Sequence, residues 1–155
     1  MNKIDERMLA FFKEHHVLSI ASVSDGKPWC SNMFYTFRNV ETPQSEMKFI
    51  FTSEDNTLHV EHFNKNNSVA GSIVLETQMV GKIQGIQFSG QVRKLEGEEY
   101  KVARIQYLKR FPVALLHKLA LWEVDVVHLK MTDNRLGFGT KLIWNKTNIL
   151  SKNED

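Results

Sequence analysis

A single cysteine, Cys30, stands in this chain of 155 residues. One thiol cannot form a disulfide within a chain, and so little cysteine favours a reducing compartment. The chain also lacks an apolar run of membrane-spanning length, and its first 16 residues lack the apolar core and small-residue cleavage site of a signal peptide. We therefore expect a cytoplasmic protein with no membrane partner.

An excess of charge of one sign is also missing. Lys and Arg number 20 against 18 Asp and Glu, a net charge of +2, and most basic residues stand beside acids. This pattern is typical of a solvated surface and argues against a nucleic-acid partner. The length and ordinary composition predict one globular domain, over residues 1–145, followed by a polar, frayed tail over residues 146–155.

Short catalytic motifs are absent too. The sequence contains no Gly-x-Ser-x-Gly, no Walker A run and no Gly-x-Gly-x-x-Gly. Cys30 has no histidine paired with it by sequence, so it is interpreted as a packing residue. His59 and His62 share a helix face, but a zinc site needs three or four ligands and no further ligand is suitably placed. We therefore predict no metal site and no catalytic residue set.

The chain does have recurring apolar alternation, interrupted by turn residues. Asp25-Gly26 indicates a hairpin turn, and Pro28 can begin the strand that follows it. Gly85 and Gly90 interrupt a longer strand, which is typical of bulges, barrel corners or close approach by a ligand. Strands are predicted over residues 17–23, 28–37, 47–52, 69–76, 81–95, 121–131 and 140–144. Helices are predicted over residues 4–12, 57–65, 98–110 and 114–118.

These elements predict a mainly β fold, a small barrel of about six strands with helices packed outside it. Trp29, Tyr35 and Phe37 fall on one face of the second strand. Because this aromatic face exceeds what a small core needs, it predicts an interface in a homodimer.

The segment between the third strand and the next helix is the most informative. The strand ends in Thr52-Ser53, and a helix begins near Thr57 with Asp55 or Asn56 as its cap. Hydroxyls and free backbone N–H groups at a helix start suit an anion such as a phosphate. The segment therefore predicts the phosphate site of a nucleotide-type cofactor.

Two polar side chains have alternative interpretations. His59 lies in the first turn of this helix, where it could face the phosphate or be a solvated surface histidine. Gln84 and Gln87 point to opposite faces of an unbulged strand. An inward glutamine such as Gln84 could bind the edge of a heterocycle, or it could hydrogen-bond to backbone at the end of the barrel.

The order of these segments, with Gln87-Phe88-Ser89-Gly90 and the closing run KMTDNRLGFGTKLIW, resembles the pyridoxamine phosphate oxidase-like FMN-binding split barrel. The segments IQGIQFSGQVRKLEGEE, KRFPVA and TDNRLGFGTKLIW resemble more closely a bacterial family of short split-barrel proteins of unassigned function. The resemblance covers about residues 5–145. It implies a six-stranded split β-barrel that binds FMN at a homodimer interface.

The resemblance also implies which residues bind the cofactor. Ser31, Asn32 and Met33 would lie beside the ring, and Phe51 and Thr52 would lie at the strand end. Thr57 and His59 would bind the phosphate. Phe138 and Lys141 would come from the second subunit. The oxidases carry an arginine where Ser31 stands and a basic pair where Leu58-His59 stands. Pyridoxamine oxidation is therefore not expected.

The function predicted from the sequence is that of an FMN-binding flavoprotein, an oxidoreductase whose substrate the sequence does not name. No residue has to be an acid, base or nucleophile, because the flavin itself performs two-electron chemistry. Two alternatives stay open. One is a non-enzymatic binding module for a flavin, haem or other planar ligand on the same barrel, and the other is a structural protein with a vacant cleft.

Overall fold

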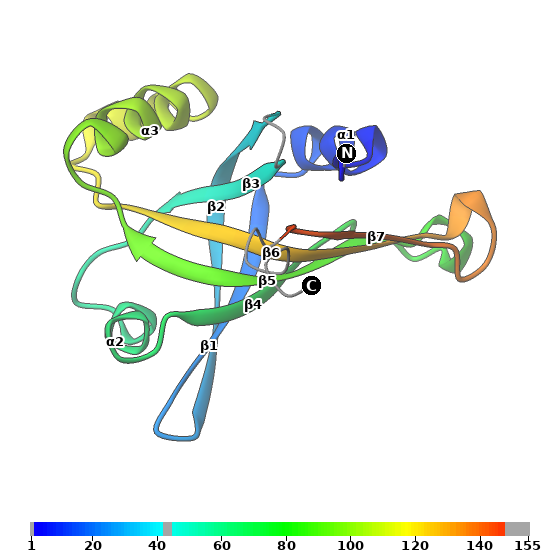
Figure 1. The fold of residues 1–155 in the computed structure, drawn as a ribbon, viewed down its shortest axis with the longest axis horizontal. Helices are drawn as coiled ribbons and strands as arrows, with labels where there is room; N and C mark the ends of the chain where they lie inside the picture. The colour runs from blue at the N-terminus through cyan, green and yellow to red at the C-terminus, as the bar shows by residue number, and fades with distance from the viewer. Residues whose placement is uncertain (1, 42–44, 148–155) are drawn as a thin grey trace, which may run out of the picture.

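Seven antiparallel strands form one sheet in the computed structural model, which describes residues 2–41 and 45–147 (Figure 1). The strands are β1 (Val17–Ser24), β2 (Lys27–Val40), β3 (Glu46–Thr52), β4 (Ser68–Val74), β5 (Gln84–Lys94), β6 (Leu121–Asp133) and β7 (Lys141–Asn145). The helices are α1 (Glu6–Glu14), α2 (Leu58–Lys65) and α3 (Gly97–Arg110), with short 3-10 turns η1 (Val80–Lys82), η2 (Pro112–Leu116) and η3 (Asn134–Leu136). Residues 148–155 of the predicted tail lie outside the described residues.

The sheet closes on itself because β6 pairs with three strands. The strand order is β3-β2-β1-β4-β5-β6-β7, and β3 also pairs with β6. Thr52 pairs with Leu121 in the first half of β6, whereas Lys141 of β7 pairs with Thr132 in its second half. Six strands therefore close the ring, and β7 continues along β6 beyond the β3 pairing. This arrangement confirms the predicted split-barrel class.

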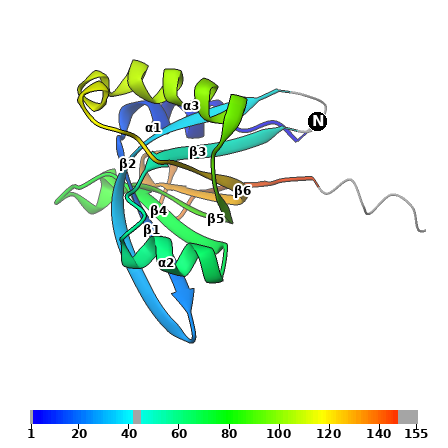
Figure 2. The same ribbon diagram turned by 90° about the vertical axis from the view of Figure 1, so that its left-hand side faces the viewer.

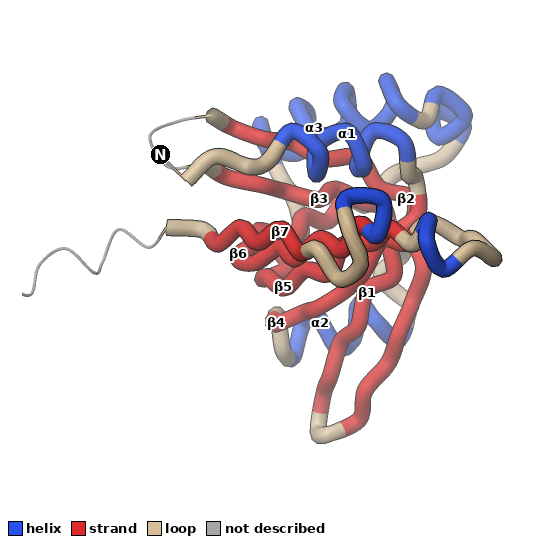
Figure 3. Tube along the Cα trace, turned by 90° about the vertical axis from the view of Figure 1, so that its right-hand side faces the viewer, coloured by secondary structure: helices blue, strands red, loops and turns tan. Residues whose placement is uncertain are grey.

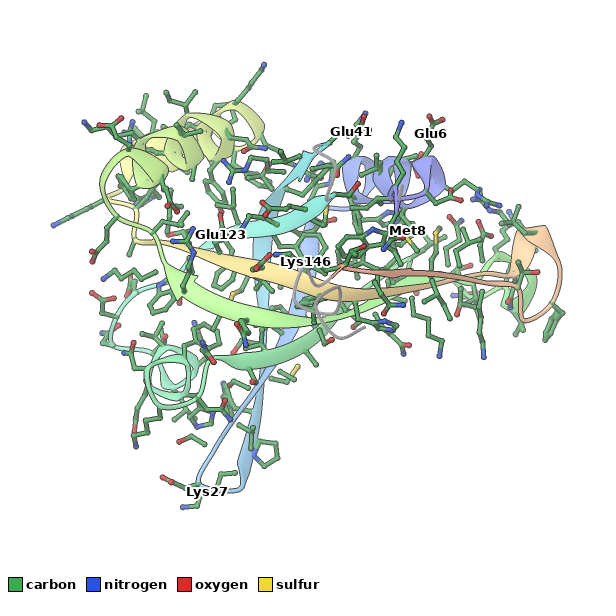
Figure 4. All side chains as sticks on the ribbon, in the orientation of Figure 1. Glu6, Met8, Lys27, Glu41, Glu123 and Lys146 are labelled. Atoms are coloured by element: carbon green, nitrogen blue, oxygen red, sulfur yellow. The ribbon has the colours of Figure 1, made fainter. Side chains whose placement is uncertain are left out.

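The first hairpin extends beyond the barrel. Asp25 and Gly26 have φ of 52° and 72°, which is the left-handed turn that the Asp-Gly pair predicts. Lys27 lies at the tip of this hairpin (Figure 4), which projects past α2 (Figure 2). At the other end of the hairpin, β2 runs on to Val40. The strand is therefore longer than the predicted range, which ended at residue 37.

The helices lie on two sides of the barrel, with α1 and α3 on one side and α2 on the other (Figure 3). Asp5 caps α1 by accepting a 2.9 Å hydrogen bond from the backbone N–H of Arg7. Met8 lies on the barrel side of α1 and is buried, whereas Glu6 lies on the opposite side (Figure 4). No helix among the described residues is long and apolar enough to cross a membrane.

Most of the aromatic face of β2 is buried in the core of the chain itself. Tyr35 is fully buried, and its hydroxyl donates a 3.1 Å hydrogen bond to the carbonyl of Phe12 in α1. Phe37 packs partly buried against the same core, 5.5 Å from the Phe12 ring. Of the predicted patch only Trp29 is well exposed, at 48%. The prediction of an exposed aromatic face was wrong for Tyr35 and Phe37, because α1 covers them.

Arg110, at the end of α3, joins this helix to α1. Its Nη2 donates to the carbonyls of Phe12, Lys13 and His15 at 2.8, 3.2 and 2.8 Å. The guanidinium also lies over the Tyr35 ring, 5.1 Å from its centroid. One side chain therefore binds the carboxyl end of α1 and stacks on the core.

Gly90 lies at a bulge, which is one of the three features predicted for the glycines of this strand. The register of β5 against β6 shifts between Ser89 and Gly90. A Cβ atom at Gly90 would lie 2.3 Å from the carbonyl oxygen of Asp125, so no side chain fits there. Gly85 pairs regularly with Val74 and Thr132 and is not a bulge.

Candidate functional site

Three hydroxyls surround the His59 ring where β2, β3 and α2 meet. We call Ser31, Ser53, Thr57 and His59 the hydroxyl–imidazole cluster. Ser31 comes from β2 and Ser53 follows β3, while Thr57 and His59 begin α2. Thr57 itself is the N-cap, since its side chain accepts a 3.4 Å hydrogen bond from the Val60 N–H. The prediction that Asp55 or Asn56 caps this helix was therefore wrong.

His59 is held through both ring nitrogens. Its Nδ1 lies 3.2 Å from Ser31 Oγ, and its Nε2 lies 3.0 Å from Thr57 Oγ1 and also hydrogen-bonds with Ser53 Oγ. Burial, with a smaller contribution from His62, lowers the pKa of His59 below its ordinary value of 6.5. This environment disfavours the charged imidazolium and favours the neutral ring. It is half-buried, which excludes the interpretation of a solvated surface histidine.

The neighbouring His62 belongs to a different contact. It is 6% exposed, and its Nδ1 lies 3.0 Å from Ser22 Oγ in β1. The two histidines therefore bind separate strands although they share a helix face. Among residues 2–41 and 45–147, no group of three or more His, Cys, Asp or Glu side chains is placed to hold a metal ion.

The loop after β3 is anchored to the segment that precedes β6. The backbone N–H of Ser53 and the hydroxyl of Thr52 both donate to the carbonyl of Ala120, each at 3.0 Å. Closure of the barrel between β3 and β6 thus fixes Ser53, which lies next to the cluster histidine.

A cavity of about 810 Å³ adjoins the cluster at Ser53. Its volume is in the range of small-molecule sites. Phe34 and Tyr107 flank Phe111 on its wall, with ring centroids 5.5 and 5.1 Å from that of Phe111. The other lining residues are Thr52, Ser53, Glu54, Val113, Ala114, His117, Lys118 and Leu119.

Four of the predicted site residues come together here: Ser31, Thr52, Thr57 and His59 lie in the cluster or on the cavity wall. Three others do not present their side chains to the cavity. Phe51 and Met33 are 0% and 8% exposed in the core, and Asn32 accepts a 2.6 Å hydrogen bond from Ser19 Oγ on the exposed face of β2.

The remaining three predicted residues lie away from the cluster within one chain. Gln84 is buried at the start of β5, beside Asp133, and borders a second cavity of about 380 Å³. Phe138 is 82% exposed in the η3–β7 loop, and Lys141 begins β7. This end of the molecule lies opposite α2 (Figure 1).

Most of the cavity wall was missed by sequence reasoning. Phe34 stands on the less bulky face of β2, which alternation alone did not favour. Tyr107, Phe111, His117 and Lys118 come from the segment after the middle of α3, and tertiary packing brings them to β2. Among these wall residues, a local signal was carried by Thr52 and Ser53, which stand at the end of a strand and before a helix.

The chain is similar in sequence to one protein family and to one group of relatives. The family described as pyridoxamine 5'-phosphate oxidase matches residues 4–132. A UPF0306 protein from Photorhabdus laumondii is 40% identical over 136 residues, which cover 88% of this chain and 92% of that protein. A second UPF0306 protein, YhbP from Escherichia fergusonii, is 37% identical over 131 residues, 84% of this chain and 86% of that protein.

Solved structures share the fold at low sequence identity. A heme binding protein from Mycobacterium smegmatis superposes with a TM-score of 0.69 at 16% identity, over 94% of this chain. This chain spans 60% of the length of that protein. A FAD-binding protein from Mesorhizobium loti superposes with a TM-score of 0.65 at 12% identity, over 81% of this chain and 90% of that protein.

Proposed function

Because the chain belongs to the pyridoxamine 5'-phosphate oxidase family, we propose that it is an FMN-binding flavoprotein and an oxidoreductase. The observation that carries this proposal is the contact between a phosphate-type site and a cavity of cofactor size. Ser53 belongs to both, since it hydrogen-bonds with His59 and lines the 810 Å³ cavity.

The residues present fit the two ends of FMN. At the phosphate end, the first turn of α2 offers backbone N–H groups and Ser53 offers a hydroxyl, both of which suit an anion. At the ring end, the aromatic wall of Phe34 and Phe111 suits a flat heterocycle. FMN supplies two-electron redox chemistry when bound, while the side chains of this chain bind it, orient it and exclude water.

A homodimer is part of the proposal. Apolar side chains line the mouth of the cavity, where Phe34 and Val113 are 58% and 71% exposed. A second copy could cover them with its η3–β7 loop, which carries the exposed Phe138. Light scattering at micromolar concentration should give twice the 18.0 kDa of one chain. A monomer mass would count against a shared site.

Flavin binding is tested by titration and heating. FMN at about 100 times its Kd adds about 2.7 kcal/mol of stability, and at this chain length we expect Tm to rise by about 5–11 °C. Riboflavin, which lacks the phosphate, should bind more weakly. An unchanged Tm in excess FMN would reject the proposal. Equal affinities for riboflavin and FMN would show that the hydroxyl–imidazole cluster does not bind the phosphate.

Haem is a second candidate ligand on the same wall. His117 lines the cavity beside its aromatic residues, and histidine is a common axial ligand of haem iron. A Soret band that appears on adding haem to the protein and is lost in His117→Ala would favour a binding module over a flavoprotein.

A further inference from the structure

The hydroxyl of Thr57 decides which ring nitrogen of His59 carries the proton. Thr57 Oγ1 donates its own hydrogen to the carbonyl of Glu54, at 3.0 Å. It therefore has no hydrogen left for His59 Nε2, also 3.0 Å away. Two lone pairs facing each other at this distance would repel, so Nε2 must carry the hydrogen that it donates to Thr57 Oγ1. The neutral ring is thus the Nε2–H tautomer.

The same count settles the other two hydroxyls. With its proton on Nε2, His59 has a lone pair on Nδ1, which accepts from the Ser31 hydroxyl at 3.2 Å. Ser53 Oγ accepts from Nε2–H alongside Thr57. The hydrogen of Ser53 then has one partner within the chain, Thr57 Oγ1 at the long distance of 3.5 Å. Ser53 also lines the cavity, where a ligand oxygen would be a better acceptor for this hydrogen.

We propose that His59 is a neutral positioning residue and that Ser53 is the donor that contacts the anionic end of the ligand. Ser31 donates to His59, His59 donates to Ser53, and Ser53 donates into the cavity. This inference rests on the proposed function for the identity of the ligand, and it assigns the phosphate contact to Ser53 rather than to a histidine cation.

The tautomer is testable without any ligand. Long-range proton–nitrogen spectra of the nitrogen-15-labelled chain at pH 7 distinguish a protonated Nε2 from a protonated Nδ1, and His59→Gln identifies the signals of residue 59. We expect Nε2 protonated and Nδ1 unprotonated. A proton on Nδ1, or on both nitrogens, would overturn the proposal whatever FMN does.

The link from His59 to Ser53 is tested with FMN on the full chain. Loss of a hydrogen bond to a charged group should weaken binding about ten- to a hundred-fold in Ser53→Ala. His59→Ala should weaken it in the same direction, and the double variant should bind no worse than Ser53→Ala alone, because both changes remove one contact. Ser68→Ala, an exposed serine at the start of β4, is the matched control.

His59→Gln separates positioning from charge. Glutamine keeps an N–H donor and an oxygen acceptor but carries no charge. We expect it to retain most of the FMN affinity that His59→Ala loses. Equal losses in the two variants, or additive losses in the double variant, would contradict the relay. If the unaltered chain binds no FMN, the proposed function fails, and the nitrogen spectra still decide the state of His59.

Discussion

Arg110→Ala should destabilise the protein substantially although Arg110 is only the last residue of α3. The side chain donates to three carbonyls, of Phe12, Lys13 and His15, and stacks over Tyr35. One nitrogen makes all three hydrogen bonds, so together they contribute about 3 kcal/mol rather than three separate charged bonds. The stacked guanidinium adds about 1 kcal/mol.

One effect opposes the stabilisation by the Arg110 side chain. Nη1 of Arg110 is buried without a partner, which costs about 1 kcal/mol. The net loss on truncation is therefore about 3 kcal/mol. At this chain length, that corresponds to a fall in Tm of about 6–12 °C. Calorimetry or circular dichroism on the purified variant measures it directly.

The neighbouring Lys109 provides the control. It is an exposed cation in the same last turn of α3, so Lys109→Ala loses only the favourable charge at the helix end, about 0.5 kcal/mol. Arg110→Lys keeps the charge without the planar fork and should fall between the two. If Arg110→Ala melts within 2 °C of Lys109→Ala, about the shift of a kcal/mol or less, then the link between α1 and α3 does not stabilise the fold.

Three further predictions concern the barrel, α1 and the cluster. Gly90→Ala should lower Tm sharply, because its Cβ would lie 2.3 Å from the Asp125 carbonyl oxygen. The control Gly85→Ala should be tolerated, since its Cβ meets nothing closer than 3.5 Å. Similar Tm values for the two variants would contradict the close approach at Gly90. The Arg7 side chain lowers the pKa of Asp5 to about 2 from 3.8, so its stabilisation is present above pH 3.8 and is lost as pH falls toward 2; acid titration of Asp5→Ala should lack that step. His59 should not change FMN affinity between pH 8 and 6.5, because its pKa is lowered, and its protonation should raise the affinity only below that range. A rise above pH 6.5 that is absent in His59→Gln would show instead that a charged His59 binds the phosphate.

Local patterns predicted the elements of the fold well. Alternating apolar residues and the Asp25-Gly26 turn indicate strands directly, because their physical causes lie within a few residues. A bulge was one of the features predicted for Gly85 and Gly90, and of the two it occurs only at Gly90. A small barrel was predicted from the number and order of these elements, but the pairing of β3 with β6 that closes it was not, since no local signal pairs segments about 70 residues apart.

The candidate site was predictable only at the hydroxyl–imidazole cluster. Thr57 and His59 follow a strand end within one short segment, so the sequence places them together. The aromatic wall unites Phe34 with Phe111, which the packing of α3 brings together. The error at Tyr35 has the same origin, because a strand pattern does not reveal that α1 will cover that face.

The carbonyl of Ala120 has a consequence for how the protein is made. Ser53 is fixed only when this carbonyl accepts its N–H, in the step that joins β3 to β6. Pairing across so long a loop is slow relative to local hairpins. A ribosome that has released residues 1–110 has therefore exposed the first five strands and α3, but no finished ligand site. If the protein binds a cofactor as proposed, binding should be among the last events of synthesis, and the bound ligand would hold the newly closed ring against reopening.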